Sequence, residues 1–299
     1  MTIINKIMFF LLLSFVITLF VSCHDPDPSY VNIYPSDIEI PGYGTLKYTK
    51  TLWDGKNQGT EILDAAKIEN KMWIFTRDNS SFYINKGTDK LAENRIRLSN
   101  DYSYWVFDLD IITKGDYVLL FASIETKTYY LTRIHKNSFN PQYFKIYEEN
   151  YDPYYGKYVY YGNDDVFIVL YEYDNYVNYP VYFYILNNDC DAFVESTEEA
   201  FNNFRSQNQN IIMSDDGKYF QIDLETDMHG RLYRSIYSKF EVSVDNGLTW
   251  HTGDMGTNIV RSIIIQDDSI YVFCDADSKW VSTWGTKSVG GGIHVFKWK

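Results

Sequence analysis

Lys114-Gly115-Asp116-Tyr117-Val118-Leu119-Leu120-Phe121 is the stretch of sequence from which the fold can be read. Gly and Asp favour a tight turn, and the five residues after them are apolar and dominated by types that strands prefer. A short apolar run directly after a turn is typical of a buried strand in an antiparallel hairpin. The stretch therefore predicts a turn followed by a buried β-strand.

The same order of turn and strand occurs four more times along the chain. The other copies are Glu69-Asn70-Lys71 with Met72–Phe75, Asn163-Asp164-Asp165 with Val166–Leu170, Asp216-Gly217-Lys218 with Tyr219–Ile222, and Asp267-Asp268-Ser269 with Ile270–Phe273. With Ile74, Leu119, Ile168, Phe220 and Val272 as equivalent positions, the steps between copies are 45, 49, 52 and 52 residues. A period of this length is typical of the four-stranded blade of a β-propeller.

Further strand patterns follow the five copies, at Ser81–Asn85, Thr128–Ile134, Pro180–Leu186, Leu232–Ser243 and Gly292–Trp298. We therefore predict an all-β fold, a β-propeller of four-stranded antiparallel blades. Tyr30–Trp53 supplies either the closing strand of the last blade or part of another blade, so the pattern predicts five or six blades. A β-sandwich is the alternative, although sandwich strands recur roughly every 8–12 residues without a longer period.

Composition agrees with a sheet protein. Aromatic residues make up 18% of the chain and include 28 Tyr, and aromatic side chains favour strands. Only Glu195–Phe204 has a weak helical period, which predicts a short helix inserted between blades.

The N-terminus has the layout of a signal peptide. Lys6 is the only charged residue before the apolar run Ile7–Val21, and Ser22-Cys23 ends that run. Phe20-Val21-Ser22-Cys23 resembles the lipobox of bacterial lipoproteins, which implies cleavage before Cys23 and acylation of its thiol, for example with palmitate. Residues 1–22 are then a signal peptide, residues 23–29 a lipidated cysteine with a polar, proline-rich tether, and residues 30–299 a single propeller domain. A retained anchor and an ordinary secretory signal are the alternatives.

Acidic residues directly after Cys23 resemble the surface-export signals of Bacteroidota lipoproteins, which implies an outer-membrane lipoprotein of the cell envelope, exposed at the surface. The formal net charge is −13. Nucleic acids are unlikely partners for such an acidic chain, because phosphate backbones are bound by clusters of Lys and Arg. The lipid anchor and the membrane are the partners that the sequence does predict.

Ser243-Val244-Asp245-Asn246-Gly247-Leu248-Thr249-Trp250 matches the Asp-box, Ser-x-Asp-x-Gly-x-Thr-Trp, at every defined position. It resembles the repeat of sialidase-like (BNR) propellers. The resemblance implies a structural role at the periphery for Ser243, Asp245, Gly247, Thr249 and Trp250. The short Asp carboxylate can accept hydrogen bonds from the backbone amides of a turn, and Gly can adopt a positive φ. Both properties suit a segment that stabilises a hairpin.

The catalytic pattern of sialidases is not matched. The place of their Arg-Ile-Pro motif holds Glu39-Ile40-Pro41, and no spacing groups three arginines. The five histidines are scattered singly, so we predict no metal site and no cofactor. Two carboxylates from different blades could still form a glycosidase site without leaving a local motif. The catalytic residues therefore stay unknown, and the sequence leans against an enzyme.

Two cysteines remain after Cys23. Cys274 lies in the apolar strand from Ile270 and is expected to be a buried thiol, with a Cys190–Cys274 disulfide as the less favoured possibility. Tyr-rich stretches with Asp, Asn and Pro predict loops whose rings stack on sugars or contact proteins, with Tyr154, Tyr155 and Trp284 as candidate binding residues. We therefore predict a non-catalytic, membrane-anchored propeller that binds a glycan or a protein. A glycoside hydrolase acting on extracellular glycans is the alternative.

Overall fold

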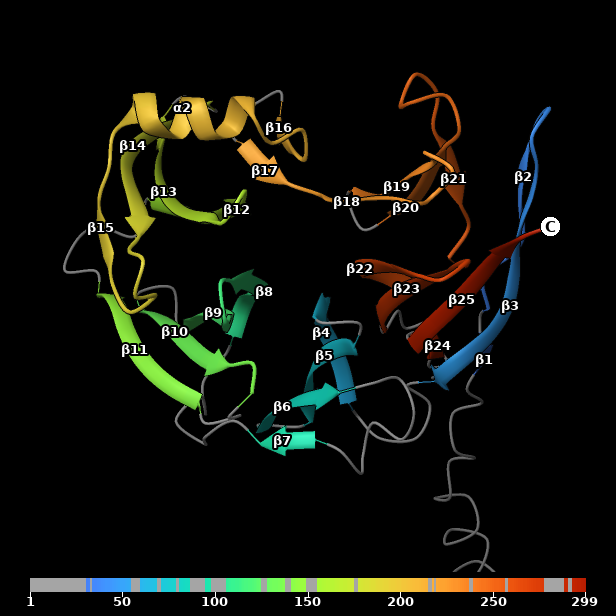
Figure 1. The fold of residues 1–299 in the computed structure, drawn as a ribbon, viewed down its shortest axis with the longest axis horizontal. Helices are drawn as coiled ribbons and strands as arrows, with labels where there is room; N and C mark the ends of the chain where they lie inside the picture. Colours follow the sequence, from blue (N-terminus) through green and yellow to red (C-terminus); the bar gives the residue numbers. More distant parts are fainter. Residues whose placement is uncertain are drawn as a thin grey trace, which may run out of the picture.

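The computed structural model describes residues 31–32, 34–54, 60–68, 71–78, 81–86, 95–97, 106–124, 128–137, 141–148, 155–174, 177–214, 217, 219–236, 239–255, 258–276, 288–289 and 292–299. Five antiparallel sheets are arranged around a central axis, as Figure 1 shows in a view close to that axis. The fold is thus a five-bladed β-propeller, and the prediction of an all-β propeller is confirmed at the lower of the two blade counts.

The first three blades are regular meanders of four strands each. Blade 1 contains β4 (Thr60–Ile68), β5 (Lys71–Asp78), β6 (Ser81–Lys86) and β7 (Arg95–Arg97). Blade 2 contains β8 (Val106–Lys114), β9 (Tyr117–Ile124), β10 (Thr128–His135) and β11 (Pro141–Glu148). Blade 3 contains β12 (Tyr155–Gly162), β13 (Asp165–Asp174), β14 (Val177–Leu186) and β15 (Phe193–Glu195).

An insertion separates blade 3 from blade 4. It comprises α2 (Glu198–Ser206), β16 (Ile211–Met213) and β17 (Tyr219–Gln221). Blade 4 contains β18 (Asp223–Thr226), β19 (Leu232–Ile236), β20 (Lys239–Ser243) and β21 (His251–Gly253). The predicted helix is therefore present, shifted by a few residues toward the C-terminus. Its N-cap is Thr197, whose side chain accepts the Ala200 N–H.

Blade 5 joins the two ends of the chain. It contains β22 (Asn258–Gln266), β23 (Ser269–Ala276), β25 (Gly292–Trp298), β3 (Gly44–Asp54) and β2 (Ile38–Ile40). The N-terminal β3 pairs antiparallel with the C-terminal β25, so of the two predicted alternatives for this segment the closing strand is the one present. A two-residue pair, β1 (Val31–Asn32) with β24 (Ser288–Val289), lies beside it. Ring closure thus depends on strands about 240 residues apart in sequence, a contact that contributes only once the whole chain is made.

The apolar runs of the sequence become the second strands of their blades. Val118–Phe121 of β9 is buried along its whole length, because both faces of the blade pack against neighbouring blades. One hydrophobic cluster joins blade 1 to blade 2 through Phe75 and Val118, and another joins blade 5 to blade 1 through Phe273 and Ile74. Burial on both faces explains why these strands read as continuous apolar runs rather than as alternating ones.

The fourth copy of the repeat was assigned to the wrong strand. Phe220 lies in β17, which pairs with β16, whereas the second strand of blade 4 is β19. The chain runs from β17 through Ile222 directly into β18, so the innermost strand of this unit is divided in two. The period near 50 residues therefore holds for blades 1 to 3 but not across the insertion.

The two described cysteines are buried, free thiols in different hydrophobic clusters. Cys190 lies in blade 3 and Cys274 in β23 of blade 5, so no disulfide joins them. The signal peptide, Cys23 and the tether lie outside the described residues. Within the part of the chain that the structure describes, no helix has the length and apolarity to cross a membrane.

The end of β12 provides a test of how blade 3 packs on the insertion. A Cβ added to Gly162 would lie 2.0 Å from Asn208 Oδ1. Asn208 is buried and its Nδ2 donates to the carbonyl of Phe204 at 2.7 Å, so it cannot move away freely. We expect Gly162→Ala to lower the free energy of unfolding by about 1–3 kcal/mol in urea denaturation.

The control is the same substitution in an Asn208→Ala background, where the clashing side chain is absent. There the added methyl group should cost far less than in the wild type. An equal cost in both backgrounds would contradict the role assigned to Asn208.

Candidate functional site

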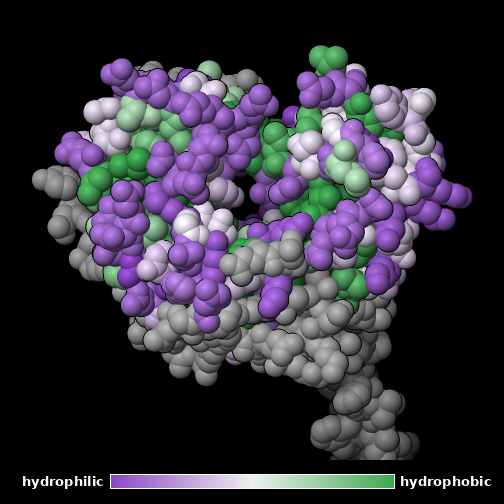
Figure 2. All heavy atoms as spheres, in the orientation of Figure 1, coloured by the Kyte–Doolittle hydropathy of each residue, from purple (hydrophilic) through white to green (hydrophobic). Residues whose placement is uncertain are grey.

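The centre of the ring contains a pocket of about 420 Å³. The first strand of every blade contributes to its wall: β4, β8, β12, β18 and β22. Figure 1 shows these five strands around the axis, and Figure 2 shows the hollow at the centre with hydrophilic residues over much of its rim. The volume lies in the range of small-molecule binding sites, roughly 300–1,000 Å³.

Polar side chains beside the pocket wall serve the backbone of neighbouring blades. The carboxylate of Asp64 on β4 accepts the Ile111 N–H of β8 at 2.6 Å and the Ala65 N–H at 2.7 Å. Between blade 3 and the insertion, the Gln221 amide accepts the Tyr161 N–H at 2.7 Å and donates to its carbonyl at 2.9 Å. These side chains satisfy backbone groups at strand edges that no other strand covers.

Asp223 and Ser262 make a similar link across blades 4, 5 and 1. Asp223 Oδ2 accepts the Ile263 N–H at 3.1 Å, and Ser262 Oγ donates to the Ala65 carbonyl at 2.7 Å. The Asp223 carboxyl also lies within hydrogen-bond reach of Ser262. Asp223 therefore ties blade 4 to blade 5, and Ser262 ties blade 5 to blade 1.

Burial raises the pKa of the Asp223 carboxyl above its usual value, against the opposing effects of the contact with Ser262 and of the Ile263 N–H. The same cause, with the nearby Asp223 adding to it, raises the pKa of Glu225 to about 7, and the positive charge of Lys67 partly offsets the rise. Glu225 is open to the water of the pocket yet has protein on several sides, as expected for a group on the wall of a narrow channel.

Glu225 differs from Asp223, its neighbour on β18, because its hydrogen-bonding capacity is unused. No hydrogen bond or ion pair reaches its carboxyl group from the described residues. Lys67 on β4 donates to the carbonyl of Ile265 at 3.2 Å. An ionisable group with a shifted pKa and no structural partner, placed in a pocket, is a candidate functional residue.

The rim of the pocket is acidic at the turn between β12 and β13. Asp164 and Asp165 are exposed there, next to Asn163, and all three line the pocket. Lys114 of β8 approaches Asp165 at 3.8 Å and so links blades 2 and 3. Lys114 is buried, whereas half of the Asp165 side chain is exposed.

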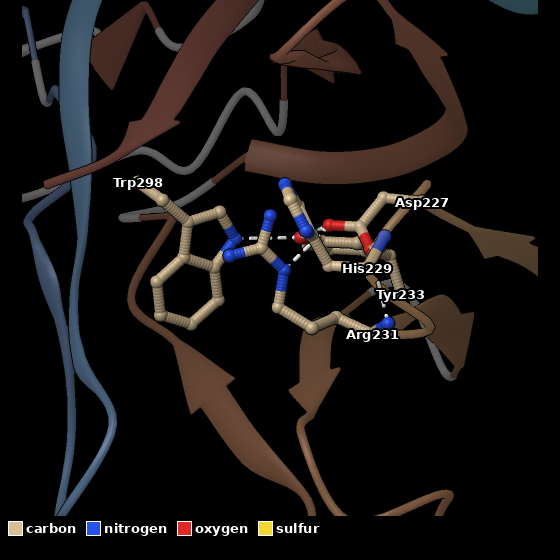
Figure 3. Close-up of polar contacts among 5 residues, drawn as sticks. All are labelled: Asp227, His229, Arg231, Tyr233 and Trp298. Atoms are coloured by element: carbon tan, nitrogen blue, oxygen red, sulfur yellow. Dashed lines mark hydrogen bonds and ion pairs between the residues drawn. The ribbon is translucent and has the colours of Figure 1, made fainter.

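A second polar cluster lies at the junction of blades 4 and 5 and is shown in Figure 3. Asp227 Oδ2 accepts Arg231 Nε at 2.6 Å and the Tyr233 hydroxyl at 2.8 Å, and the Trp298 indole N–H donates to Tyr233 at 2.6 Å. Although burial raises the pKa of Asp227, these bonds together with the backbone N–H of His229 lower it below its usual value. All these groups are mutually satisfied, so the cluster ties the C-terminal strand to blade 4 rather than forming a site.

The Ser243–Trp250 segment is the turn between the two outer strands of blade 4, away from the pocket. Asp245 Oδ1 accepts the Thr249 N–H at 2.9 Å, Ser243 Oγ accepts the Gly247 N–H at 2.8 Å, and Gly247 has a φ of 84°. Trp250 lies against the Arg234 guanidinium at 3.8 Å. The local geometry matches a hairpin staple, and membership of the Asp-box family stays a prediction.

The described residues do not place the aromatic binding residues predicted from the sequence at the pocket. Tyr154 and Trp284 lie outside the described residues, as does Cys23, and Tyr155 begins β12 with its side chain outside the description. Within the described residues, no group of three or more His, Cys, Asp or Glu side chains is placed to hold a metal ion.

The pocket residues that the sequence did not single out are Lys67, Asp223 and Glu225. The signal for the two acids was local: Asp223-Leu224-Glu225 alternates acid and apolar residues, which places both acids on one face of a strand. The predicted repeat has Phe220 as its fourth equivalent position, which leaves residues 223–226 without a predicted strand, so this alternation did not stand out.

Comparisons with known proteins concern the fold. No family model matches the sequence, and no curated protein matches it significantly. The GH43_1 enzyme from Xanthomonas citri, complexed with xylotriose, is 10% identical over 82% of this chain and 88% of that one, with a TM-score of 0.43. The endo-arabinase from Bacteroides thetaiotaomicron is 12% identical over 81% and 97%, with a TM-score of 0.34.

Oligopeptidase B from Leishmania major is also similar, at 10% identity over 88% of this chain and 42% of that one, with a TM-score of 0.34. The likeness is one of fold. Glycoside hydrolases and a peptidase are both among these structures, so function has to be argued from the site itself.

The raised pKa of Glu225 predicts a pH-dependent stability. Between its usual value of 4.5 and about 7, the folded state retains a proton that the unfolded state has lost. The contribution of Glu225 to stability therefore falls as the pH rises through this window. We expect the difference in free energy of unfolding, Glu225→Gln minus wild type, to be larger at pH 8 than at pH 4.5 in urea denaturation of residues 24–299.

A difference between Glu225→Gln and wild type that is the same at pH 4.5 and pH 8 would contradict a raised pKa at Glu225.

Proposed function

We propose that this chain is a membrane-anchored exported lipoprotein whose propeller binds a glycan in the central pocket without cleaving it. The observation that carries the proposal is the Glu225 carboxyl group, which faces a pocket of about 420 Å³ and has no protein partner among the described residues. Carboxylates, amides and ammonium groups on a preformed wall are the groups that fix the hydroxyls of a bound sugar.

Two features favour binding over hydrolysis. Asp223 and Glu225 lie two residues apart on the same face of β18 and so on one wall of the pocket, whereas a glycosidase places its carboxyl groups on either side of the scissile bond. Asp223 is also engaged by Ile263 and Ser262. A glycoside hydrolase remains the second candidate, because a carboxyl group with a pKa of about 7 suits a general acid.

Glycan-array binding by residues 24–299 tests the proposal. We expect wild-type protein and Glu199→Gln to bind the same glycans and Glu225→Gln to bind them about tenfold or more weakly. Binding that survives Glu225→Gln but is lost on combined substitution of Tyr154, Tyr155 and Trp284 by Ala would move the site to the loops.

Incubation of the bound glycans with wild-type protein, followed by product analysis, separates the two candidates. No release of sugar is expected. Release that falls at least about a hundredfold in Glu225→Gln would establish the hydrolase instead.

Anchoring at the envelope is tested separately. Cys23→Ala removes the only thiol that the lipobox-like sequence offers for acylation, so the protein should leave the membrane fraction for the soluble one. Ser29→Ala, in the same tether, should stay with the membrane. Unchanged partitioning of Cys23→Ala would contradict lipidation at this residue.

A further inference from the structure

Lys67 and Glu225 carry opposite charges on different blades and both line the pocket. They sense each other's charge, since Lys67 lowers the pKa of Glu225, yet no hydrogen bond or ion pair joins them within the described residues. The bond from Lys67 Nζ to the Ile265 carbonyl at 3.2 Å keeps the ammonium group on its own side. Two of its three hydrogens remain for another acceptor.

The wall carries little net charge near neutral pH. Burial raises the pKa values of both Asp223 and Glu225, so these two acids keep part of their protons, and the ammonium group of Lys67 offsets the negative charge that remains. The rim beyond them carries Asp164 and Asp165, with Lys114 near the latter at 3.8 Å. An anionic ligand would meet this rim within an already acidic protein, and a cationic one would meet Lys67 inside.

We propose that Lys67 and Glu225 clamp a pair of neighbouring hydroxyl groups of an uncharged sugar, the ammonium donating to one oxygen and the carboxylate accepting from the other. This assignment rests on the proposed function and specifies its substrate class. A vicinal diol is the simplest group that offers an acceptor and a donor side by side without net charge. The clamp makes Lys67 a specificity-determining residue that no sequence motif indicated.

The first experiment compares three classes of saccharide on an array with residues 24–299. These are uncharged oligosaccharides of glucose, xylose, galactose and mannose, uronate-containing oligosaccharides, and glucosamine oligosaccharides. The uncharged class is expected to supply the bound members. Preferential binding of uronates or glucosamine oligosaccharides would overturn the clamp while leaving glycan binding intact, and binding of no saccharide would overturn the proposed function itself.

The second experiment is a double-mutant cycle by calorimetry with the tightest-binding uncharged oligosaccharide of that array. Lys67→Met and Glu225→Gln should each weaken binding by about tenfold or more, since hydrogen bonds to charged groups are the stronger ones. The double variant should be only a few-fold weaker than the worse single variant, because one clamp is lost once. Glu199→Gln on α2, which is not among the residues that line the pocket, is the control and should change affinity less than threefold.

Effects that multiply in the double variant, or an unchanged affinity in Lys67→Met, would overturn the clamp. Thermal unfolding of each variant identifies any loss of binding that comes from a loss of folding. In that case Lys67→Arg, which keeps the charge and the long apolar stem, is used in its place and should retain most of the affinity.

Discussion

The inner edge of each blade is the constraint on which this structure depends. The first strand of a blade has a neighbour on one side only, and its other edge turns toward the centre, where backbone groups would be left without partners. Side chains of adjacent blades supply the missing partners: Asp64 for the Ile111 N–H, Asp223 for the Ile263 N–H and Ser262 for the Ala65 carbonyl. Each of these bonds also joins two blades, so saturating the edges and closing the ring are one process.

That constraint separates the polar residues of the channel into two kinds. Asp64, Asp223 and Ser262 are engaged by the backbone, and their replacement would leave buried groups unsatisfied, at a cost of about 1–3 kcal/mol each. Glu225 makes no such bond to the backbone, and its raised pKa means that its negative charge lowers the stability of the folded state. A residue that lowers stability at neutral pH without serving the fold has its explanation in binding or chemistry.

The fold was predictable because propeller blades repeat one physical arrangement. Each central strand is buried on both faces, so turns followed by apolar runs such as Val118–Phe121 recur at nearly constant spacing. The closing role of the N-terminal segment followed from the same reasoning and is realised as β3 against β25. The blade count was open because the sequence alone did not separate a closing strand from part of a sixth blade.

The site was less predictable because it is assembled from single residues of different blades. Lys67 of β4 and Glu225 of β18 are 158 positions apart, and neither belongs to a motif. Their meeting depends on the ring, which local patterns do not encode. The Tyr-rich segments were conspicuous in the sequence, yet many of their rings serve the core, as Tyr160 and Tyr171 do in the cluster that packs blade 3 against α2.

The unit whose first strand is divided, blade 4, carries the unengaged carboxyl group of Glu225. In blades 1 to 3 an uninterrupted first strand leads into the second, whereas residues 219–226 divide into β17, which pairs with β16, and β18, which pairs with β19. Before the break, Tyr219 and Gln221 form the hydrogen bonds to blade 3. After it, Asp223 and Glu225 lie on the face of β18. The regular spacing of the apolar runs identifies the fold. The spacing fails at Phe220, next to β18, and on β18 the fold does not require the Glu225 side chain, which is therefore available for binding.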